Sequence, residues 1–297
     1  MFSIANKQIL AEGIKRIDIL APDIAKQAKP GQFVTISAEH GMEKIPLPIV
    51  DLDLNRGTIA FVFEEKIKEL KVLGSLGINE KVFSIVGPLG EPIKVIGPKK
   101  TIVFVGTGLG TISMLPLCRA FKKADNKVIS VVGLSNKKRL ILEAQLRLSC
   151  YKIFISTDDG SYQQRGMATD ILEKVLSEED VSFVYAVGSI QMMRKVCELT
   201  KSKGVSMRIY LLPKRGDCVG LCGACRINVA GNQKLICVDG PEFDGHKIDY
   251  DELDIRMKSM SGINGGSLCR TNQEKQKPQD GLKTLEKFLG GILKKKL

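Results

Sequence analysis

The segment Thr101-Ile-Val-Phe-Val-Gly-Thr-Gly-Leu-Gly110 divides the chain into two kinds of sequence pattern. Its first five residues form a short apolar run, which is typical of a strand buried on both faces of a sheet. A glycine-rich turn follows, and a helical pattern then extends from Ile112 to Lys123. A buried strand, a tight turn and a helix in this order predict the first unit of a parallel α/β sheet.

The residues after this unit continue the alternation of strands and helices. Helices that connect parallel strands cover both faces of their sheet. We therefore expect a nucleotide-binding α/β domain over residues 99–211. Its further strands are predicted at 127–134, 152–156, 181–187 and 206–211, and its further helices at 140–148, 166–176 and 191–203.

The residues before this unit form short alternating or apolar runs that are broken by proline and glycine. Turn signals include Pro30-Gly31 and the stretch Gly87-Pro-Leu-Gly90. Short strands at this spacing predict an antiparallel β-barrel over residues 1–98. The runs lie at 15–20, 32–36, 58–63 and 81–86.

Composition and charge limit the functional classes to which this protein can belong. The 297 residues include 45 Lys and Arg against 33 Asp and Glu, so the net charge is +12. The chain has no tryptophan and no basic stripe with interleaved aromatics, so nucleic-acid binding is not expected. No apolar run approaches the roughly 20 residues that span a bilayer, and no secretory signal pattern opens the chain. We expect a cytoplasmic protein without a membrane span.

Four of the eight cysteines fall within residues 218–237, in a glycine-rich segment. Plant-type ferredoxins space their cluster ligands as C-x4-C-x2-C…C. Here Cys222, Cys225 and Cys237 fill the last three positions, and Asp217 fills the first. The glycines between them can adopt the positive φ values that a loop around a cluster needs. We predict a [2Fe–2S] domain over residues 212–260, with these four residues as ligands.

Two alternatives for this segment remain. Structural zinc usually takes two ligand pairs, whereas the chain offers one C-x2-C and only two histidines. Thiols without a metal are the second alternative, and the crowding of cysteines argues against it. The cysteines outside the segment, Cys118, Cys150 and Cys197, are expected to pack in the core, and Cys269 lies in a polar stretch.

The glycine turn of residues 106–110 is a candidate nucleotide site. Gly106, Gly108 and Gly110 would let a pyrophosphate approach the N-terminus of the following helix. The pattern is G-x-G-x-G, not the G-x-G-x-x-G of the Rossmann fingerprint, so a purely structural turn is the alternative. Asp158 and Asp159 follow the third strand and are expected at the same carboxyl edge, where open sheets bind ligands.

The choice between NAD(H) and NADP(H) stays open. No acidic residue stands at the end of the second strand, where a ribose 2′-hydroxyl would need one. Lys137, Lys138 and Arg139 stand there instead and could bind a 2′-phosphate, or could form a solvated basic loop.

Several motifs together resemble the small subunit of NADH-dependent ferredoxin–NADP oxidoreductase, also known as sulfide dehydrogenase. The resemblance extends more distantly to the electron-transfer subunit of dihydroorotate dehydrogenase B, and it runs from about residue 4 to residue 258. In that family one aspartate and three cysteines hold the cluster, which matches the four ligands predicted above. The motifs are Pro30-Gly-Gln-Phe33, Ile45-Pro-Leu47, Gly87-Pro-Leu-Gly90, Ser156-Thr-Asp-Asp-Gly-Ser161, Cys222-Gly-Ala-Cys225 and Cys237-Val-Asp-Gly-Pro-Glu-Phe-Asp-Gly-His246.

The resemblance implies a ferredoxin-reductase-like fold, with an FAD-type barrel, an NAD-binding domain and a small C-terminal [2Fe–2S] domain. It implies an NAD(P)H-dependent oxidoreductase subunit that passes electrons between nicotinamide, FAD and the cluster to a larger flavin/iron–sulfur subunit. Ferredoxin is a further candidate partner, and no catalytic side chain is predicted. The implied cofactor-binding residues are Lys44, Ile45, Pro46, Leu47, Pro48, Glu65, Gly106, Gly108, Gly110, Asp158, Asp159, Gly188 and Met193.

The FAD-binding positions depart from the family pattern. Lys44 and Pro48 stand where members have an arginine and a hydroxyl residue, and the segment after Glu65 lacks the usual glycine and hydroxyls. These positions supply hydrogen bonds to phosphate. The alternative function is therefore a non-catalytic assembly or one-electron relay module that kept the cluster and lost FAD.

The end of the chain, residues 261–297, is predicted to be a polar linker followed by a basic amphipathic helix. A frayed terminal helix is favoured over a membrane or partner anchor. The apolar residues at helical spacing are Leu282, Leu285, Phe288, Leu289, Ile292 and Leu293.

Overall fold

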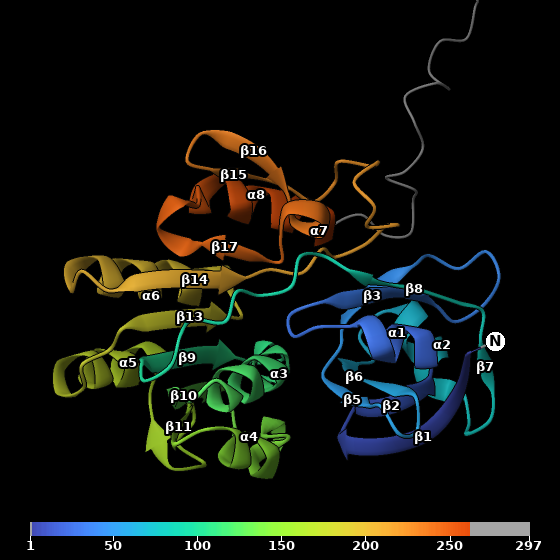
Figure 1. The fold of residues 1–297 in the computed structure, drawn as a ribbon, viewed down its shortest axis with the longest axis horizontal. Helices are drawn as coiled ribbons and strands as arrows, with labels where there is room; N and C mark the ends of the chain where they lie inside the picture. Colours follow the sequence, from blue (N-terminus) through green and yellow to red (C-terminus); the bar gives the residue numbers. More distant parts are fainter. Residues whose placement is uncertain (1, 262–297) are drawn as a thin grey trace, which may run out of the picture. The chain divides into compact units, whose positions relative to one another are not determined.

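The computed structural model describes residues 2–261, and Figure 1 shows their fold. The predicted linker and amphipathic helix, together with Cys269, lie outside the described residues. Within residues 2–261, no helix has both the length and the apolar character needed to cross a bilayer.

The N-terminal region forms two antiparallel sheets, as the barrel prediction requires. One sheet has the strand order β5-β6-β2-β1-β7 and the other has the order β4-β3-β8. The elements are β1 (Phe2–Ala11), β2 (Ile14–Leu20), α1 (Pro22–Gln27), β3 (Phe33–Ser37), β4 (Ile45–Pro48), β5 (Asp51–Asp53), β6 (Thr58–Glu64), α2 (Lys68–Ser75), β7 (Lys81–Val82) and β8 (Ser84–Leu89).

Side-chain alternation sets the register of these strands. In β2, Ile17 and Ile19 point into the barrel core while Ile14 packs in a different cluster, and β2 pairs with β6 along its whole length. The single strand predicted at 81–86 was wrong, because Phe83 divides it into β7 and β8, which belong to different sheets. The Phe83 N–H donates to the Ala38 carbonyl at 3.0 Å, which turns the chain from one sheet toward the other.

The central region confirms the predicted alternation of parallel strands and helices. Strands β9 to β14 give the order β12-β11-β10-β9-β13-β14, and all pairs among them are parallel. The elements are β9 (Thr101–Thr107), α3 (Gly110–Lys123), β10 (Lys127–Leu134), η1 (Lys137–Arg139), α4 (Glu143–Ser149), β11 (Lys152–Thr157), β12 (Gln164–Arg165), α5 (Ala168–Glu178), β13 (Phe183–Val187), α6 (Ile190–Ser202) and β14 (Ser206–Tyr210).

Helices cover both faces of this sheet, as expected. Leu172 of α5 and Val196 of α6 pack with Val105 and Val184 in one core, while Phe121 of α3 packs with Phe104 in another. The helix predicted from residue 140 begins only at Glu143, because the 3₁₀ turn η1 and a left-handed Leu142 (φ +57°) precede it.

The C-terminal segment holds more regular structure than its sequence pattern predicted. It contains a hairpin, two short turns of helix, a strand and a twelve-residue helix, all visible in Figure 1. Strand β17 pairs antiparallel with β14 and so extends the parallel sheet by one strand. The elements are β15 (Arg226–Val229), β16 (Asn232–Leu235), α7 (Ile236–Asp239), β17 (Glu242–Asp244), η2 (Gly245–Lys247) and α8 (Tyr250–Ser261).

Local interactions of charged residues explain why helix α8 forms, and the pattern of these residues could have predicted it. The Asp249 carboxylate accepts the backbone N–H groups of Asp251 and Glu252 and so caps the helix. Ion pairs at i,i+4 spacing join Glu252 to Arg256 and Asp254 to Lys258. Its apolar pattern is weak, so hydrophobic periodicity alone misses it.

An apolar contact joins the barrel to the α/β domain. Ile14 and Val62 from the barrel pack with Ile112, Leu115 and Leu134 from the domain. Arg119 of α3 adds an ion pair to Asp51 of β5, with Nη1 and Oδ1 2.7 Å apart. This contact places the carboxyl edge of the parallel sheet beside strands β4 and β6.

Candidate functional site

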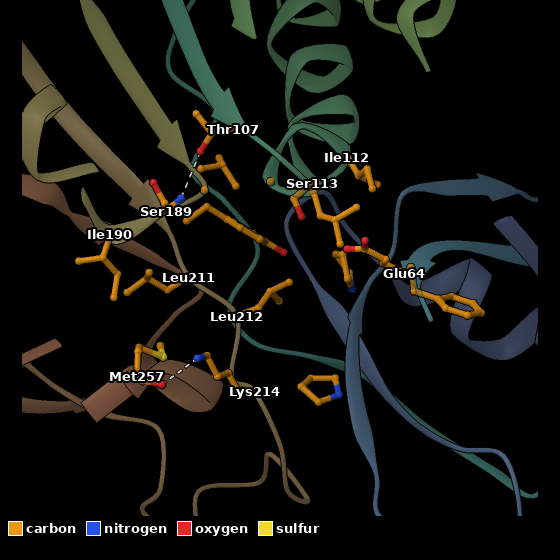
Figure 2. Close-up of a pocket in the computed structure, with 18 of the residues that line it drawn as sticks. Glu64, Thr107, Ile112, Ser113, Ser189, Ile190, Leu211, Leu212, Lys214 and Met257 are labelled. Atoms are coloured by element: carbon orange, nitrogen blue, oxygen red, sulfur yellow. Dashed lines mark hydrogen bonds between the residues drawn. The ribbon is translucent and has the colours of Figure 1, made fainter. Parts of the chain in front are cut away.

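A cavity of about 890 Å³ lies where the barrel meets the carboxyl edge of the parallel sheet. Strands β4 and β6 form one wall, and the starts of α3 and α6 form another. Figure 2 shows Thr107, Ser113 and Ser189 on one side of it and Glu64 of the barrel across from them. The volume suits an organic cofactor or substrate.

Six of the predicted cofactor residues line this cavity. They come from β4, from the glycine turn, from the residue after β13 and from α6. The residues are Pro46, Leu47, Pro48, Gly110, Gly188 and Met193.

The other predicted cofactor residues lie elsewhere. Ile45 is buried in the barrel core, and Glu65 forms an ion pair with Lys15 at 2.8 Å. Lys44 pairs with Asp217 of the cysteine segment. Gly106 lies near the end of β9, and Gly108, Asp158 and Asp159 lie in turns at the carboxyl edge; none of the four lines the cavity.

The glycines of the β9–α3 turn have packing reasons to be glycine. A Cβ on Gly110 would overlap the Val187 carbonyl, and one on Gly106 would overlap the Met114 side chain. Gly108 has φ +55° and open space around it, so its requirement is conformational. The turn therefore brings the N-terminus of α3 against β13 at the cavity wall.

Sequence reasoning missed several residues that line the cavity. Thr107 accepts the Ser189 N–H at 3.2 Å, and Ser113 is buried on the first turn of α3. Lys214 donates to the Met257 carbonyl of α8 at 2.8 Å (Figure 2). A hydroxyl residue directly after a buried strand was an available signal for Thr107, whereas α8 reaches the cavity only through tertiary contacts.

Glu64 is the acidic residue on the barrel side of the cavity. Its carboxylate forms ion pairs with Arg139 at 2.7 Å and with Lys66 at 2.8 Å. Burial acts to raise the pKa of Glu64, but hydrogen bonds from Lys66 and Arg139 outweigh it and lower the pKa. Arg139, a candidate for binding a 2′-phosphate, is therefore engaged by a carboxylate.

We expect the Glu64→Gln variant to have a lower free energy of unfolding than wild type, by an amount that depends on pH. The folded pKa lies below the ordinary 4.5, so the ion pairs contribute fully above pH 4.5. Their contribution is lost as the pH falls through the lowered folded pKa. Urea unfolding at pH 7 should give a variant less stable by about 1 kcal/mol.

The difference between wild type and Glu64→Gln should shrink as the pH falls below 4.5. A matched Glu12→Gln change at an exposed barrel position should show no such trend. A difference that stays constant from pH 7 to pH 3 would contradict the assignment.

Cys225 and Cys237 meet in the C-terminal segment. Their Sγ atoms are 3.3 Å apart, and both side chains are buried. The hydrogen bond between the two sulfurs lowers the pKa of Cys225 to about 6, although burial opposes this, and the backbone N–H groups of Cys237, Ile236 and Cys225 contribute further. The same hydrogen bond and burial raise the pKa of Cys237. A lowered thiol pKa favours the thiolate, the form of cysteine that ligates metals.

The other two predicted ligands lie on the loop before this pair. Cys222 is exposed, and Asp217 has 58% of its side chain exposed and its Oδ1 2.7 Å from Lys44 Nζ. Among residues 2–261, no three His, Cys, Asp or Glu side chains converge on a single-ion site. Cys218, between them in sequence, is buried at φ +57°.

The loop has the backbone freedom that the spacing predicted. Gly220 and Gly223 adopt φ values of +84° and +61°. The Gly220 N–H points at Cys237, where it lowers the thiol pKa. Cys118, Cys150 and Cys197 are buried in the core, as predicted.

The comparisons with known proteins agree with this arrangement. Residues 216–249 match the family model for the iron–sulfur cluster binding domain of dihydroorotate dehydrogenase B. A chain in the structure of NADH-dependent reduced ferredoxin–NADP oxidoreductase superposes with a TM-score of 0.82 and is 32% identical, over 87% of this chain and 93% of that one. The fold and segment define an iron–sulfur oxidoreductase subunit of ferredoxin-reductase-like architecture.

Sequence comparison over most of the chain identifies the family. A dihydroorotate dehydrogenase B (NAD(+)) electron transfer subunit homolog of Thermotoga maritima is 35% identical over 84% of this chain and 88% of its own length. An uncharacterized protein of Clostridium beijerinckii is 37% identical over 88% of this chain and 90% of its own. The chain belongs to the family of dihydroorotate dehydrogenase B electron-transfer subunits and their homologues.

Proposed function

We propose that this chain is the electron-transfer subunit of an NAD(P)H-linked flavin/iron–sulfur oxidoreductase. The observation that carries the proposal is the 3.3 Å approach of Cys225 and Cys237 within the segment that matches the family's cluster domain. The chain runs from the cavity wall at Leu212 and Lys214 directly into this segment. The cavity and the cluster segment are therefore adjacent along the chain.

We assign the four ligands in two pairs. Cys225 and Cys237 would bind one iron of a [2Fe–2S] cluster, and Asp217 and Cys222 would bind the other. A two-iron cluster takes two protein ligands on each iron, so no three side chains need converge on one point. The chemistry of the site supports this, because three thiols and a carboxylate follow the ferredoxin spacing and backbone N–H groups point at the sulfurs.

The cavity residues would bind a flavin and a nicotinamide. Pro46, Leu47, Pro48 and Ile112 provide apolar walls for planar rings. FAD would supply the change from two-electron hydride transfer to one-electron transfer, which neither nicotinamide nor cluster can make alone. Lys66 lines the cavity at the position where the family places flavin phosphate, and its ammonium can offset a phosphate charge.

The residues of the chain would bind, orient and exclude water. Gly110 and Gly188 let the start of α3 pack closely against the end of β13 at the cavity wall, while Met193 and Leu211 make that wall apolar. Thr107 and Ser189 bind each other through the Ser189 N–H and fix the two strand ends that flank the opening. No side chain has to abstract a proton in this scheme.

We also propose the domains, the partner and the location of this protein. The domains are an FAD-binding-type barrel at 1–98, an NAD(P)-binding domain at 99–211 and a cluster domain at 212–260. The partner is a larger oxidoreductase subunit that receives the electrons, with ferredoxin as a further candidate. A reducing, cytoplasmic location suits the seven cysteines of residues 2–261, which form no disulfide.

Analysis of the anaerobically purified full chain tests the proposal. We expect about two irons and two acid-labile sulfides per chain, together with flavin released by acid. Added NADH or NADPH should bleach the flavin and cluster absorbance together. Iron without extractable flavin would favour the relay module that kept the cluster and lost FAD, and absence of iron and sulfide would overturn both functions.

A further inference from the structure

The first half of the cluster segment, residues 212–224, contains no helix or strand. Side-chain contacts hold it in place: Cys218 is buried in a core cluster, and Lys214 donates to the Met257 carbonyl at 2.8 Å. The second half differs, because β15 and β16 form a hairpin and the Ile236 N–H donates to the Cys225 carbonyl at 3.1 Å. Cys225 therefore directly precedes β15 and Cys237 lies in α7, while Asp217 and Cys222 lie on a loop that side-chain contacts hold.

Two ion pairs attach this loop to the barrel. Arg215 Nη1 lies 2.7 Å from Glu43 Oε2, and Lys44 Nζ lies 2.7 Å from Asp217 Oδ1. Glu43 and Lys44 are neighbours at the start of β4, and their partners are two residues apart on the loop. A single exposed ion pair contributes little, but two pairs between the same short segments fix both position and rotation.

Lys44 occupies only one oxygen of the Asp217 carboxylate. The hydrogen bond uses Oδ1, so Oδ2 is available to a metal. Carboxylates that ligate metals are commonly oriented by a second hydrogen bond of this kind. The Lys44 ammonium would also stabilise the reduced cluster, which carries one more negative charge than the oxidised one.

We propose that Lys44 is a positioning residue for the iron–sulfur cluster and that the Glu43–Arg215 ion pair seats the same loop. Lys44 orients the Asp217 carboxylate and raises the reduction potential of the cluster. The barrel thus controls the loop that carries half of the ligands. This inference rests on the proposed function, because it assigns Asp217 as a ligand.

The first test is the Lys44→Gln variant of the full chain. Loss of the cluster to a chelator, followed by absorbance, should be about 10-fold faster than in wild type. The midpoint potential from an EPR-monitored titration should move to a more negative value, and Lys44→Arg should restore most of it. Lys26→Gln, the same charge change on α1 of the barrel, should leave both readouts at the wild-type values.

The second test exchanges the charges of the other pair. Glu43→Arg and Arg215→Glu should each accelerate cluster loss, and the double variant should recover slower loss. Wild-type potential and chelation rate in Lys44→Gln would overturn the inference while leaving the proposed function intact. Absence of iron from the wild-type chain would instead overturn the proposed function, so the two failures are distinguishable.

Discussion

Replacing Cys225 with serine is expected to lower the iron content of the purified chain from about two atoms to near zero. Cys225 is buried beside Cys237, and hydrogen bonds lower its pKa to about 6, which favours the thiolate that binds iron. A serine hydroxyl is a much weaker ligand because it stays protonated near neutral pH. Iron and acid-labile sulfide analysis of the anaerobically purified variant measures the effect.

The control for this variant is Cys150→Ser. Cys150 is equally buried, and its Sγ donates to the Leu146 carbonyl at 2.7 Å, a bond that a serine hydroxyl can also make. The control should keep the wild-type iron content. Far-UV circular dichroism should show that both variants are folded. Two irons retained in Cys225→Ser would refute the ligand set.

The identity of the fourth ligand follows from a paired comparison. Asp217→Ala should release iron faster than Cys218→Ala, because Asp217 occupies the first position of the ferredoxin spacing. Cys218 is buried in a left-handed conformation, so its replacement should mainly affect packing. The opposite order of iron loss would transfer the ligand role to Cys218.

The Gly110→Ala variant is expected to lose dinucleotide binding and part of the folding stability. An added Cβ would meet the carbonyl of Val187 and the Cα of Gly188, both backbone atoms that cannot rotate away. The start of α3 must then move from β13 at the cavity wall. Overpacking of this kind typically costs about 1–3 kcal/mol. Urea unfolding and calorimetric titration with NADH and NADPH measure the two effects, and we expect at least a roughly tenfold weaker affinity.

Gly204→Ala provides the matched control for Gly110→Ala. Gly204 has φ +67°, and an added Cβ would meet nothing within 4 Å. The control should therefore show a modest strain cost of about 1 kcal/mol and unchanged dinucleotide affinity. A wild-type affinity for NADH and NADPH in Gly110→Ala would show that this turn is not part of the dinucleotide site.

The sequence predicted the elements whose causes are local. The bounds of β10 agree with the predicted 127–134, because a run of apolar residues between a polar start and a serine–asparagine turn marks a buried strand. The cysteine spacing predicted that Cys225 and Cys237 belong together, and the structure brings their sulfurs to 3.3 Å. The left-handed Gly220 and Gly223 follow from the same local reasoning.

The sequence pattern did not predict contacts between distant segments. Strand β17 completes the central sheet from more than thirty residues beyond β14 and was not expected there. Lys44 was assigned to flavin phosphate, yet its ammonium binds Asp217, which is 173 residues away in sequence. Glu64 and Arg139, both on the cavity side of their domains, were likewise paired only by the contact of barrel and sheet.

The amino-acid pattern was thus sufficient for the class of fold and for the segment that matches the iron–sulfur domain. Each of these depends on periodicity or on spacing within one short stretch, where the backbone geometry is the same in any context. The wall of the cavity and the attachment of the cluster loop depend instead on tertiary contacts. They depend on which surfaces meet when apolar residues such as Val62 and Ile112 leave water together, and the sequence does not encode that pairing locally.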